Sequence, residues 1–176
     1  FVFRKTPSDV GCITVHSVQE ISNGLKFLSQ DGFYFFDGSN SIKVSDRIAD
    51  TLDLFTRNRF KNSVSAYQRE NNRYWCSFTT SGQTQHNRVI TWDSSNNAYS
   101  FYKGHAANAY AIVFITGQER IYFGDYSGYI YRGDITEDDQ DTAGADVAVN
   151  AFYKTKWYNF GDLVDKKGIA HVTLFH

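Results

Sequence analysis

A hairpin pattern that recurs along the chain constrains its fold more than any other feature. In its clearest copy, RIYFGDYSGYIYRGD from Arg120 to Asp134, two runs of aromatic and β-branched residues flank the turn sequence GDYSG. Such runs favour β-strands, and glycine supplies turn backbone angles that other residues avoid. The pattern predicts two antiparallel strands joined by a tight turn, with a positive φ angle at Gly128.

Two earlier stretches repeat this hairpin. FLSQDG leads into FYFFDG from Phe27 onward, and the strand-like RYWC from Arg73 leads into SFTTSG. The turn glycines Gly32, Gly82 and Gly128 are 50 and 46 residues apart. A period of about 40–50 residues with several strands in each unit is typical of β-propeller blades. We therefore predict an all-β fold of about three four-stranded antiparallel blades, arranged as an open or partial propeller.

The chain order of expected elements follows from these repeats. The expected strands are residues 12–18, 25–28, 33–36, 41–44, 63–67, 73–78, 89–93, 98–102, 109–116, 121–123 and 129–131. The stretch 109–116 is almost entirely apolar, which predicts a strand buried on both faces. Between the first two blades, Ile48, Leu52 and Phe55 recur at helical spacing. We expect one short helix there, beginning after Ser45 as its N-cap.

The last part of the sequence changes character. Residues 136–146 are polar and acidic, which predicts an exposed loop; Asp138, Asp139 and Asp141 suggest calcium, but the glycine of an EF-hand loop is missing. We expect residues 1–150 to form the propeller segment, and residues 151–176 to supply closing strands or the start of a following β module. Because the sequence opens on Phe1 and contains no methionine, we also expect an internal fragment of a longer protein.

Composition argues against several classes of protein. The net charge is −1 and the pI is near 6.6, so no basic field would attract nucleic acid or an anionic membrane. The sequence contains no run of about 18 apolar residues, so we expect no membrane-spanning helix. The basic residues Arg57, Arg59 and Lys61 are expected to form a solvated helix end.

Cys12 and Cys76 lie in apolar runs and are expected to be buried reduced thiols, with a disulfide left open as the alternative.

The search for catalytic patterns finds no nucleophile elbow, HExxH motif or phosphate-binding loop. The aspartates at predicted hairpin ends are expected to accept hydrogen bonds from turn N–H groups, although a ring of carboxylates at a propeller mouth is an alternative reading. These aspartates are Asp31, Asp37, Asp93, Asp125 and Asp134, and the scattered histidines are His16, His86, His105, His171 and His176. We assign no catalytic, cofactor-binding or metal-binding residue and expect no enzyme.

Several of these segments together carry a family resemblance. FLSQDGFYFFDG, RYWCSF, VITWD, RIYFGDYSGYIYRGD and AFYKTKWYNFGD with the following KK resemble the β-propeller part of bacteriophage tail proteins. The nearest type is the tail nozzle (tail tubular protein B) family, with its packaged-DNA stabilisation relatives. The resemblance covers roughly residues 11 to 168, but this chain is shorter than a whole family member, and three units do not close a propeller.

The resemblance implies a structural virion protein that acts by assembly and not by catalysis. It implies a homo-oligomeric ring, usually a hexamer, that extends the DNA exit channel below the portal. The implied neighbours are other tail or portal-adaptor proteins, with weak DNA contact in the channel and no membrane contact. The expected location is the virion tail, after assembly in the host cytoplasm.

A glycan- or receptor-binding propeller module of a phage or cell-surface protein is the alternative function. Exposed aromatic residues such as Tyr126 and Tyr129 would stack on sugars in such a module. Glycan cleavage would need two facing carboxylates at a defined separation. The turn from Ser29 to Gly32 is slightly similar to the Asp-box turn of sialidases, but it lacks the spacing before its glycine and the aromatic pattern after it.

Overall fold

The structure, a computed structural model, describes residues 5–133, together with 139–140 and 146–147. The chain divides into two compact units, residues 1–135 and residues 136–176. The first unit contains three antiparallel sheets, which confirms the expected all-β class with open blades and one short α-helix. The expected boundary near residue 150 stays a prediction.

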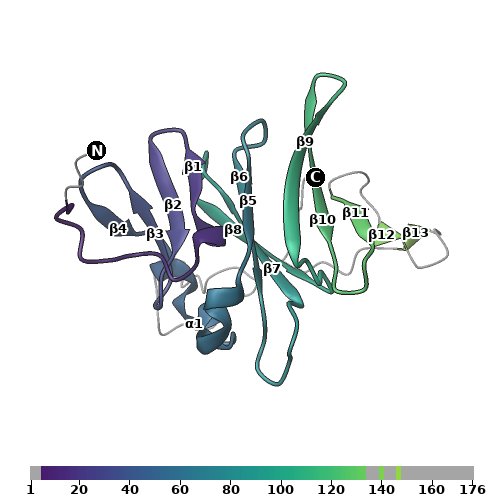
Figure 1. The fold of residues 1–176 in the computed structure, drawn as a ribbon, viewed down its shortest axis with the longest axis horizontal. Coiled ribbons are helices and arrows are strands. Elements are labelled where there is room, and N and C mark those ends of the chain that lie inside the picture. The colour runs from purple at the N-terminus through teal and green to yellow at the C-terminus, as the bar shows by residue number, and fades with distance from the viewer. Residues whose placement is uncertain (1–4, 134–138, 141–145, 148–176) are drawn as a thin grey trace, which may run out of the picture. The chain divides into compact units, whose positions relative to one another are not determined.

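Each of the three sheets is built from strands that are neighbours in sequence (Figure 1). The first sheet contains β1 (Gln19–Ile21), β2 (Gly24–Leu28), β3 (Phe33–Phe36) and β4 (Ser41–Lys43). The second contains β5 (Ser65–Gln68), β6 (Arg73–Phe78), β7 (Arg88–Asp93) and β8 (Ala98–Lys103). The third contains β9 (Ala109–Ile115), β10 (Gln118–Gly124) and β11 (Ile130–Arg132). The strands expected between residues 25 and 131 are confirmed, with ends that differ by a few residues.

The second unit contains one short strand pair among its described residues. β12 (Asp139–Gln140) pairs antiparallel with β13 (Asp146–Val147). The exposed loop predicted over residues 136–146 therefore contains paired strand residues at Asp139, Gln140 and Asp146, where backbone pairing overrides a weak strand preference. The closing strands expected in residues 151–176 lie outside the described residues.

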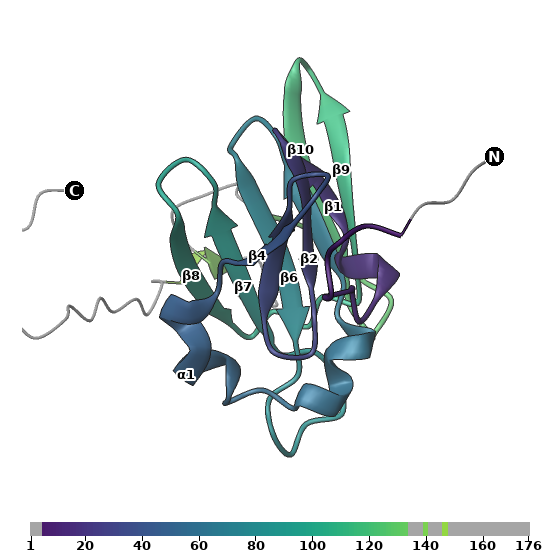
Figure 2. The ribbon, with the colours of Figure 1, turned by 90° about the vertical axis from the view of Figure 1, so that its left-hand side faces the viewer.

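The largest core lies between the first and second sheets. Its buried side chains come from both sheets and from the segment between them: Ile21, Leu28, Phe33, Ile48, Leu52, Phe55, Phe60, Tyr67, Tyr74, Cys76, Phe78, Ile90 and Trp92. Phe33 meets Tyr74 and Phe78 edge-on, with ring centres 5.7 and 5.8 Å apart. Such aromatic pairs add about 0.5–1.5 kcal/mol each beyond the area they bury. In Figure 2 the first sheet faces the viewer with strands of the second sheet behind it.

A smaller core joins the second sheet to the third. Ala66, Trp75 and Val89 of the second sheet pack with Ile121 of β10, and Tyr110 is among the half-buried residues against them. The described residues therefore cover the second sheet on both faces, whereas they cover the third sheet on one. This asymmetry determines which surfaces remain exposed.

The strand expected over residues 12–18 is not formed. A short 3₁₀ helix occupies Val15–Ser17, and the first strand begins at Gln19. The Thr14 side chain accepts a hydrogen bond from the His16 N–H, and the Ser17 hydroxyl donates to the Thr14 carbonyl. Such local bonds offer the backbone an alternative to strand pairing.

The two thiols also differ from each other, against expectation. Cys12 is exposed and Cys76 is buried, and both are free. The prediction of a buried thiol is therefore wrong for Cys12 and confirmed for Cys76. Cys12 is exposed because the segment that carries it is not a core strand, whereas Cys76 lies in the central strand β6. Burial raises the pKa of the Cys76 thiol to about 12.

The expected helix is present but shorter. A 3₁₀ turn at Asp46–Ile48 leads into α1 (Ala49–Leu52). Ser45 makes no side-chain capping bond; its buried hydroxyl instead accepts from the Phe33 N–H at 2.9 Å. The predicted N-cap role is therefore wrong, because the start of β3 uses that hydroxyl. The apolar face is confirmed, since Ile48, Leu52 and Phe55 are all buried.

The basic cluster after the helix is also more ordered than expected. Arg57–Asn62 forms another 3₁₀ helix. Arg57 forms an ion pair with Asp53, and Arg59 donates to the Thr84 carbonyl at 2.7 Å. The two guanidinium groups therefore have protein partners.

The turn of the third sheet matches its prediction. Gly128 adopts a φ angle of +89°, in the left-handed region that glycine occupies readily. The Asp125 N–H donates to the Tyr129 carbonyl at 3.0 Å, which closes the turn. The hairpin of β10 and β11 is therefore the one that the sequence pattern indicated.

Candidate functional site

Within the part of the chain that the structure describes, one face of the third sheet is uncovered, and we call it the outer face. Ile112 and Ile121 are paired across β9 and β10 and point into the smaller core. Successive residues of a strand point to opposite sides, and directly paired residues share a side. The outer face therefore carries Ala109, Ala111, Val113, Ile115, Gln118, Arg120, Tyr122, Gly124, Ile130 and Arg132.

Apolar side chains dominate the exposed part of this face. Val113 and Ile115 are each 40% exposed, and Ile130 is 78% exposed. The prediction that residues 109–116 form a strand buried on both faces is therefore wrong. The apolar run is real, but among the described residues nothing packs on the outer side of β9. Exposed apolar groups gathered in this way mark interaction surfaces.

An aromatic group lies at the hairpin end of the same sheet. The rings of Phe123 and Tyr131 stack with centres 5.2 Å apart, and Tyr129 lies 6.5 Å from Tyr131. Tyr129 is 66% exposed, which agrees with its expected exposure. Rings with one free face are suitable for contact with another protein or with the flat face of a sugar.

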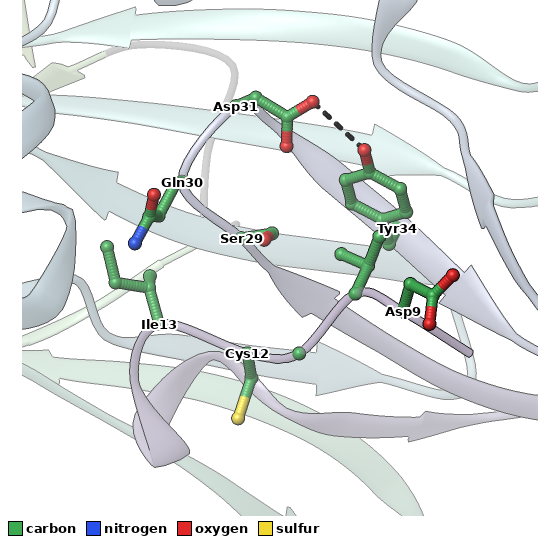
Figure 3. Close-up of a pocket in the computed structure, with 9 residues that line it drawn as sticks. Asp9, Cys12, Ile13, Ser29, Gln30, Asp31 and Tyr34 are labelled. Carbon is green, nitrogen blue, oxygen red and sulfur yellow. Dashed lines mark hydrogen bonds between the residues drawn. The ribbon is translucent and has the colours of Figure 1, made fainter. Parts of the chain in front are cut away.

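A hollow lies beside the first sheet, between the N-terminal segment and the turn from β2 to β3 (Figure 3). Its volume is about 580 Å³, and its lining includes Asp9, Cys12, Gln30, Asp31 and Tyr34. Figure 3 shows the Asp31 carboxylate directed at the Tyr34 hydroxyl, which donates to it at 2.9 Å. The hollow combines polar groups with an exposed thiol.

The Asp31 carboxylate is already paired. Lys43 lies 3.0 Å from it. Partial burial raises its pKa, but the hydrogen bonds from Lys43 and Tyr34 outweigh that effect and the pKa is lowered overall. At neutral pH this group is an ionised partner of Lys43, and it helps to hold the β2–β3 turn against β4.

The other aspartates at hairpin ends serve the turns, as expected. The Asp37 carboxylate accepts from the N–H groups of Ser39 and Asn40 at 2.8 and 2.7 Å. Asp93 accepts from the Ser95 N–H, and Asp125 from the N–H groups of Ser127 and Tyr129. Asp134 lies outside the described residues. The turn-capping interpretation is confirmed for Asp37, Asp93 and Asp125.

Sequence reasoning missed the environment of His86. This side chain is buried, and its Nδ1 lies 2.8 Å from the Ala107 carbonyl oxygen and 3.0 Å from the Tyr126 hydroxyl. Nδ1 therefore carries the proton that the carbonyl accepts. Nε2 is buried with no hydrogen-bond partner among the described residues. Burial lowers the pKa of His86, and the nearby Arg59 charge adds to that effect.

Lys26 is the second residue that sequence reasoning missed. Its ammonium nitrogen lies 3.4 Å from the centre of the Trp92 ring and 5.2–5.4 Å from the ring centres of Phe33, Tyr74 and Tyr99. The side chain is fully buried, and burial lowers its pKa well below 10.5. The faces of the four rings favour the charged form of Lys26, which offsets part of the free-energy cost of burying that charge. In the sequence, only the place of Lys26 among the apolar residues of its strand could have indicated that its side chain is buried.

Within the described part of the chain, no group of three or more His, Cys, Asp or Glu side chains is arranged to hold a metal ion. No helix there is both long and apolar enough to span a bilayer. No protein-family model matches the chain, and no curated protein is significantly similar to it.

Proposed function

We propose that this chain is a structural component of a phage tail, similar to a nozzle or connector, that forms part of a DNA exit channel. It acts by assembly and does not turn over a substrate. The observation that carries this proposal is the apolar outer face of the third sheet, on which Val113 and Ile115 of β9 and Ile130 of β11 are each exposed. Apolar surface of this kind drives protein association when another surface covers it.

The polar groups are consistent with such a role. The carboxylates of Asp37, Asp93 and Asp125 are occupied in turns, and Asp31 is paired with Lys43. They stabilise the loops between strands, which keeps each sheet rigid. The family resemblance of the hairpin motifs supplies the phage context and the ring-shaped homo-oligomer. Under this proposal the chain is located in the virion tail, next to other tail or portal-adaptor proteins.

Electron microscopy of purified virions tests the proposal. The full protein carries a tag outside residues 1–176, and untagged virions are the control. Label at a ring below the portal is the expected result. Absence of the protein from particles, together with polysaccharide binding or cleavage by the purified chain, would overturn it.

Glycan binding is a second candidate, favoured by the exposed rings of Tyr129 and Tyr131. Stacking of one aromatic side chain contributes about 0.5–1.5 kcal/mol in protein pairs, so several rings are needed for useful affinity. A glycan array probed with the chain and with its Tyr129→Ala variant tests this function. Binding that the variant loses, while a Val15→Ala control retains it, would favour glycan recognition over assembly.

A further inference from the structure

Three connecting segments meet at the buried residue His86, which lies at the end of the loop between β6 and β7. Its Nδ1–H donates at 2.8 Å to the carbonyl of Ala107, in the segment between β8 and β9. Its main-chain N–H donates at 3.4 Å to the hydroxyl of Tyr126, in the turn between β10 and β11. The rings of His86 and Tyr126 meet edge-on, with centres 5.9 Å apart. One residue therefore fastens a loop of the second sheet to two segments at the end of the third.

The loop that carries His86 is closed at its base and exposed along its length. The Asn87 side-chain oxygen accepts from the main-chain N–H of Thr80 at 3.0 Å, which closes the base. Residues 81–85 are all exposed. Arg59 donates to a carbonyl of the loop at 2.7 Å and holds it to the preceding 3₁₀ helix. Separation of the loop from the third sheet would leave both cores in place, since His86 belongs to neither.

A second proton on the His86 ring has no acceptor among the described residues. Nε2 is buried there without a hydrogen-bond partner, and a buried charge without a partner is costly. Burial lowers the pKa of His86, the hydrogen bond to Ala107 raises it by less, and the charge of Arg59 lowers it further. The charged ring therefore favours an open arrangement in which water reaches Nε2.

Charged or titratable groups lie on each element that meets at His86. They include Tyr126 and Asp125 of the hairpin turn, His105 of the segment with Ala107, Arg59 of the 3₁₀ helix and Arg88 at the start of β7. The Asp125 carboxylate is bound within its own turn, where it accepts from two main-chain N–H groups and from the Tyr131 hydroxyl. Arg88 donates to the adjacent carbonyl of Asn87 at 2.8 Å, and the His105 ring packs on Phe123. None of these contacts brings a carboxylate to the His86 ring.

We propose that His86 is an acid-operated latch, whose protonation releases the loop between β6 and β7 from Ala107 and from Tyr126 while the three sheets stay folded. The open form takes up the proton more readily than the closed form, so opening is favoured as the pH falls below about 6.5. The hydrogen bond between Ser77 and Tyr110 and the smaller core still join the second sheet to the third. The latch does not depend on the tail role proposed above.

A buried thiol reports the opening. Ala107 is fully buried, so Ala107→Cys places a thiol beneath the loop. Cys12→Ser removes the exposed thiol from every protein, and the buried Cys76 remains as an internal reporter of global unfolding. A pyridyl disulfide, which also reacts with thiols in acid, labels each protein at about pH 7.5 and at about pH 5, on either side of the ordinary histidine pKa. Rates are divided by those of an unfolded cysteine peptide at the same pH.

The corrected rate at the introduced thiol is expected to rise at least about tenfold between the two pH values, whereas Cys76 stays protected. His86→Gln should abolish the rise, because glutamine does not titrate and still offers a donor to the Ala107 carbonyl. His105→Gln, the matched control in the same segment, should retain it. An equal rise at Cys76, a rise that persists in His86→Gln or disappears in His105→Gln, or no rise at all would each overturn the proposal.

A second measurement covers the case in which Ala107→Cys does not fold. Nuclear magnetic resonance of the unaltered chain follows the Overhauser contact between the rings of His86 and Tyr126. This contact is expected at about pH 7.5 and should be lost at about pH 5, while the amide signals of β6 and β10 stay in place. A contact that persists at the lower pH rejects the latch. So does a loss of the contact together with those amide signals, because the whole fold would then have opened.

Discussion

The Ser77 hydroxyl of β6 lies 2.6 Å from the Tyr110 hydroxyl of β9, and this hydrogen bond joins the second sheet to the third. Ser77 is fully buried, so water does not replace a lost partner. We predict that Tyr110→Phe lowers the free energy of unfolding by about 1–3 kcal/mol, the cost of an unsatisfied buried hydroxyl. Urea denaturation measures the change.

The matched control is Tyr129→Phe, which removes an exposed hydroxyl. We expect it to change the unfolding free energy by less than about 0.5 kcal/mol. Ser77→Ala combined with Tyr110→Phe should cost less than the two single changes together, because the double variant leaves no unpaired hydroxyl. Equal effects of Tyr110→Phe and the control would contradict the role of this bond.

The buried Lys26 predicts an unusual dependence of stability on pH. Burial lowers its pKa in the folded protein, so between that value and 10.5 the unfolded chain binds more protons. Stability contributed by this group therefore rises as the pH increases through that window. Lys26→Met keeps the length of the side chain and removes the titration. We predict that the parent chain gains stability relative to Lys26→Met between about pH 7 and pH 9.5.

Urea denaturation of both proteins at the two pH values measures this difference. Lys43→Met is the control, since Lys43 is partly exposed and its pKa is raised by Asp31. That substitution should not produce the same gain. A difference between the parent chain and Lys26→Met that does not vary with pH would show that Lys26 keeps its ordinary pKa.

His86 should make the fold sensitive to acid. Its pKa is lowered by burial, so below about pH 6.5 the unfolded chain takes up a proton that the folded chain resists. The stability that neutral His86 provides is lost as the pH falls from 6.5 toward the folded-state pKa. We predict that the midpoint of thermal unfolding falls less steeply with decreasing pH in His86→Gln than in the parent chain.

Nuclear magnetic resonance checks the same assignment directly. Nitrogen chemical shifts of the imidazole should show the proton on Nδ1, which lies 2.8 Å from the Ala107 carbonyl oxygen. A proton on Nε2 at neutral pH would instead make the Tyr126 hydroxyl a donor to Nδ1 and would refute the assigned tautomer.

The turn at Gly128 tests a purely conformational effect. Its φ angle is +89°, and a Cβ atom placed there would meet no atom within 4 Å. A penalty for substitution would therefore come from backbone strain and not from crowding. We predict that Gly128→Val lowers the unfolding free energy by about 1–2 kcal/mol. Gly11→Val, at an equally open position without a positive φ, should change it by less than about 0.5 kcal/mol in the same thermal or urea experiment.

Much of the strand order could be predicted, because local patterns determine it. The hairpin of β10 and β11 follows from two aromatic runs around a glycine-bounded turn, and Gly128 adopts the expected backbone angle. The carboxylates of Asp37 and Asp125 bind the turns that their positions indicated. These features depend on residues close in sequence, so sequence alone is sufficient for them.

Features that depend on distant residues could not be predicted in the same way. The sequence of β9 is that of a doubly buried strand, but burial depends on whether another sheet covers its second side. Lys26 resembles a solvated lysine until Trp92 and three other rings are placed around it. Cys12 looked buried because Thr14 and Ser17 were not recognised as residues that favour a local turn. The surface that carries the proposed function is one of these long-range features.

The pairing of consecutive strands in all three large sheets has a consequence for synthesis. Every ladder joins segments separated by one short turn or loop, so little loop-closure entropy opposes it and folding is expected to be fast. A ribosome adds about 5–20 residues per second, so the ladder from Gln19 to Lys43 is complete before β9 emerges. The sheets of the nascent chain are thus expected to form one after another, in the order in which their strands are synthesised. At each step the newest sheet has one face that the next sheet does not yet cover, and chaperones meet this face first.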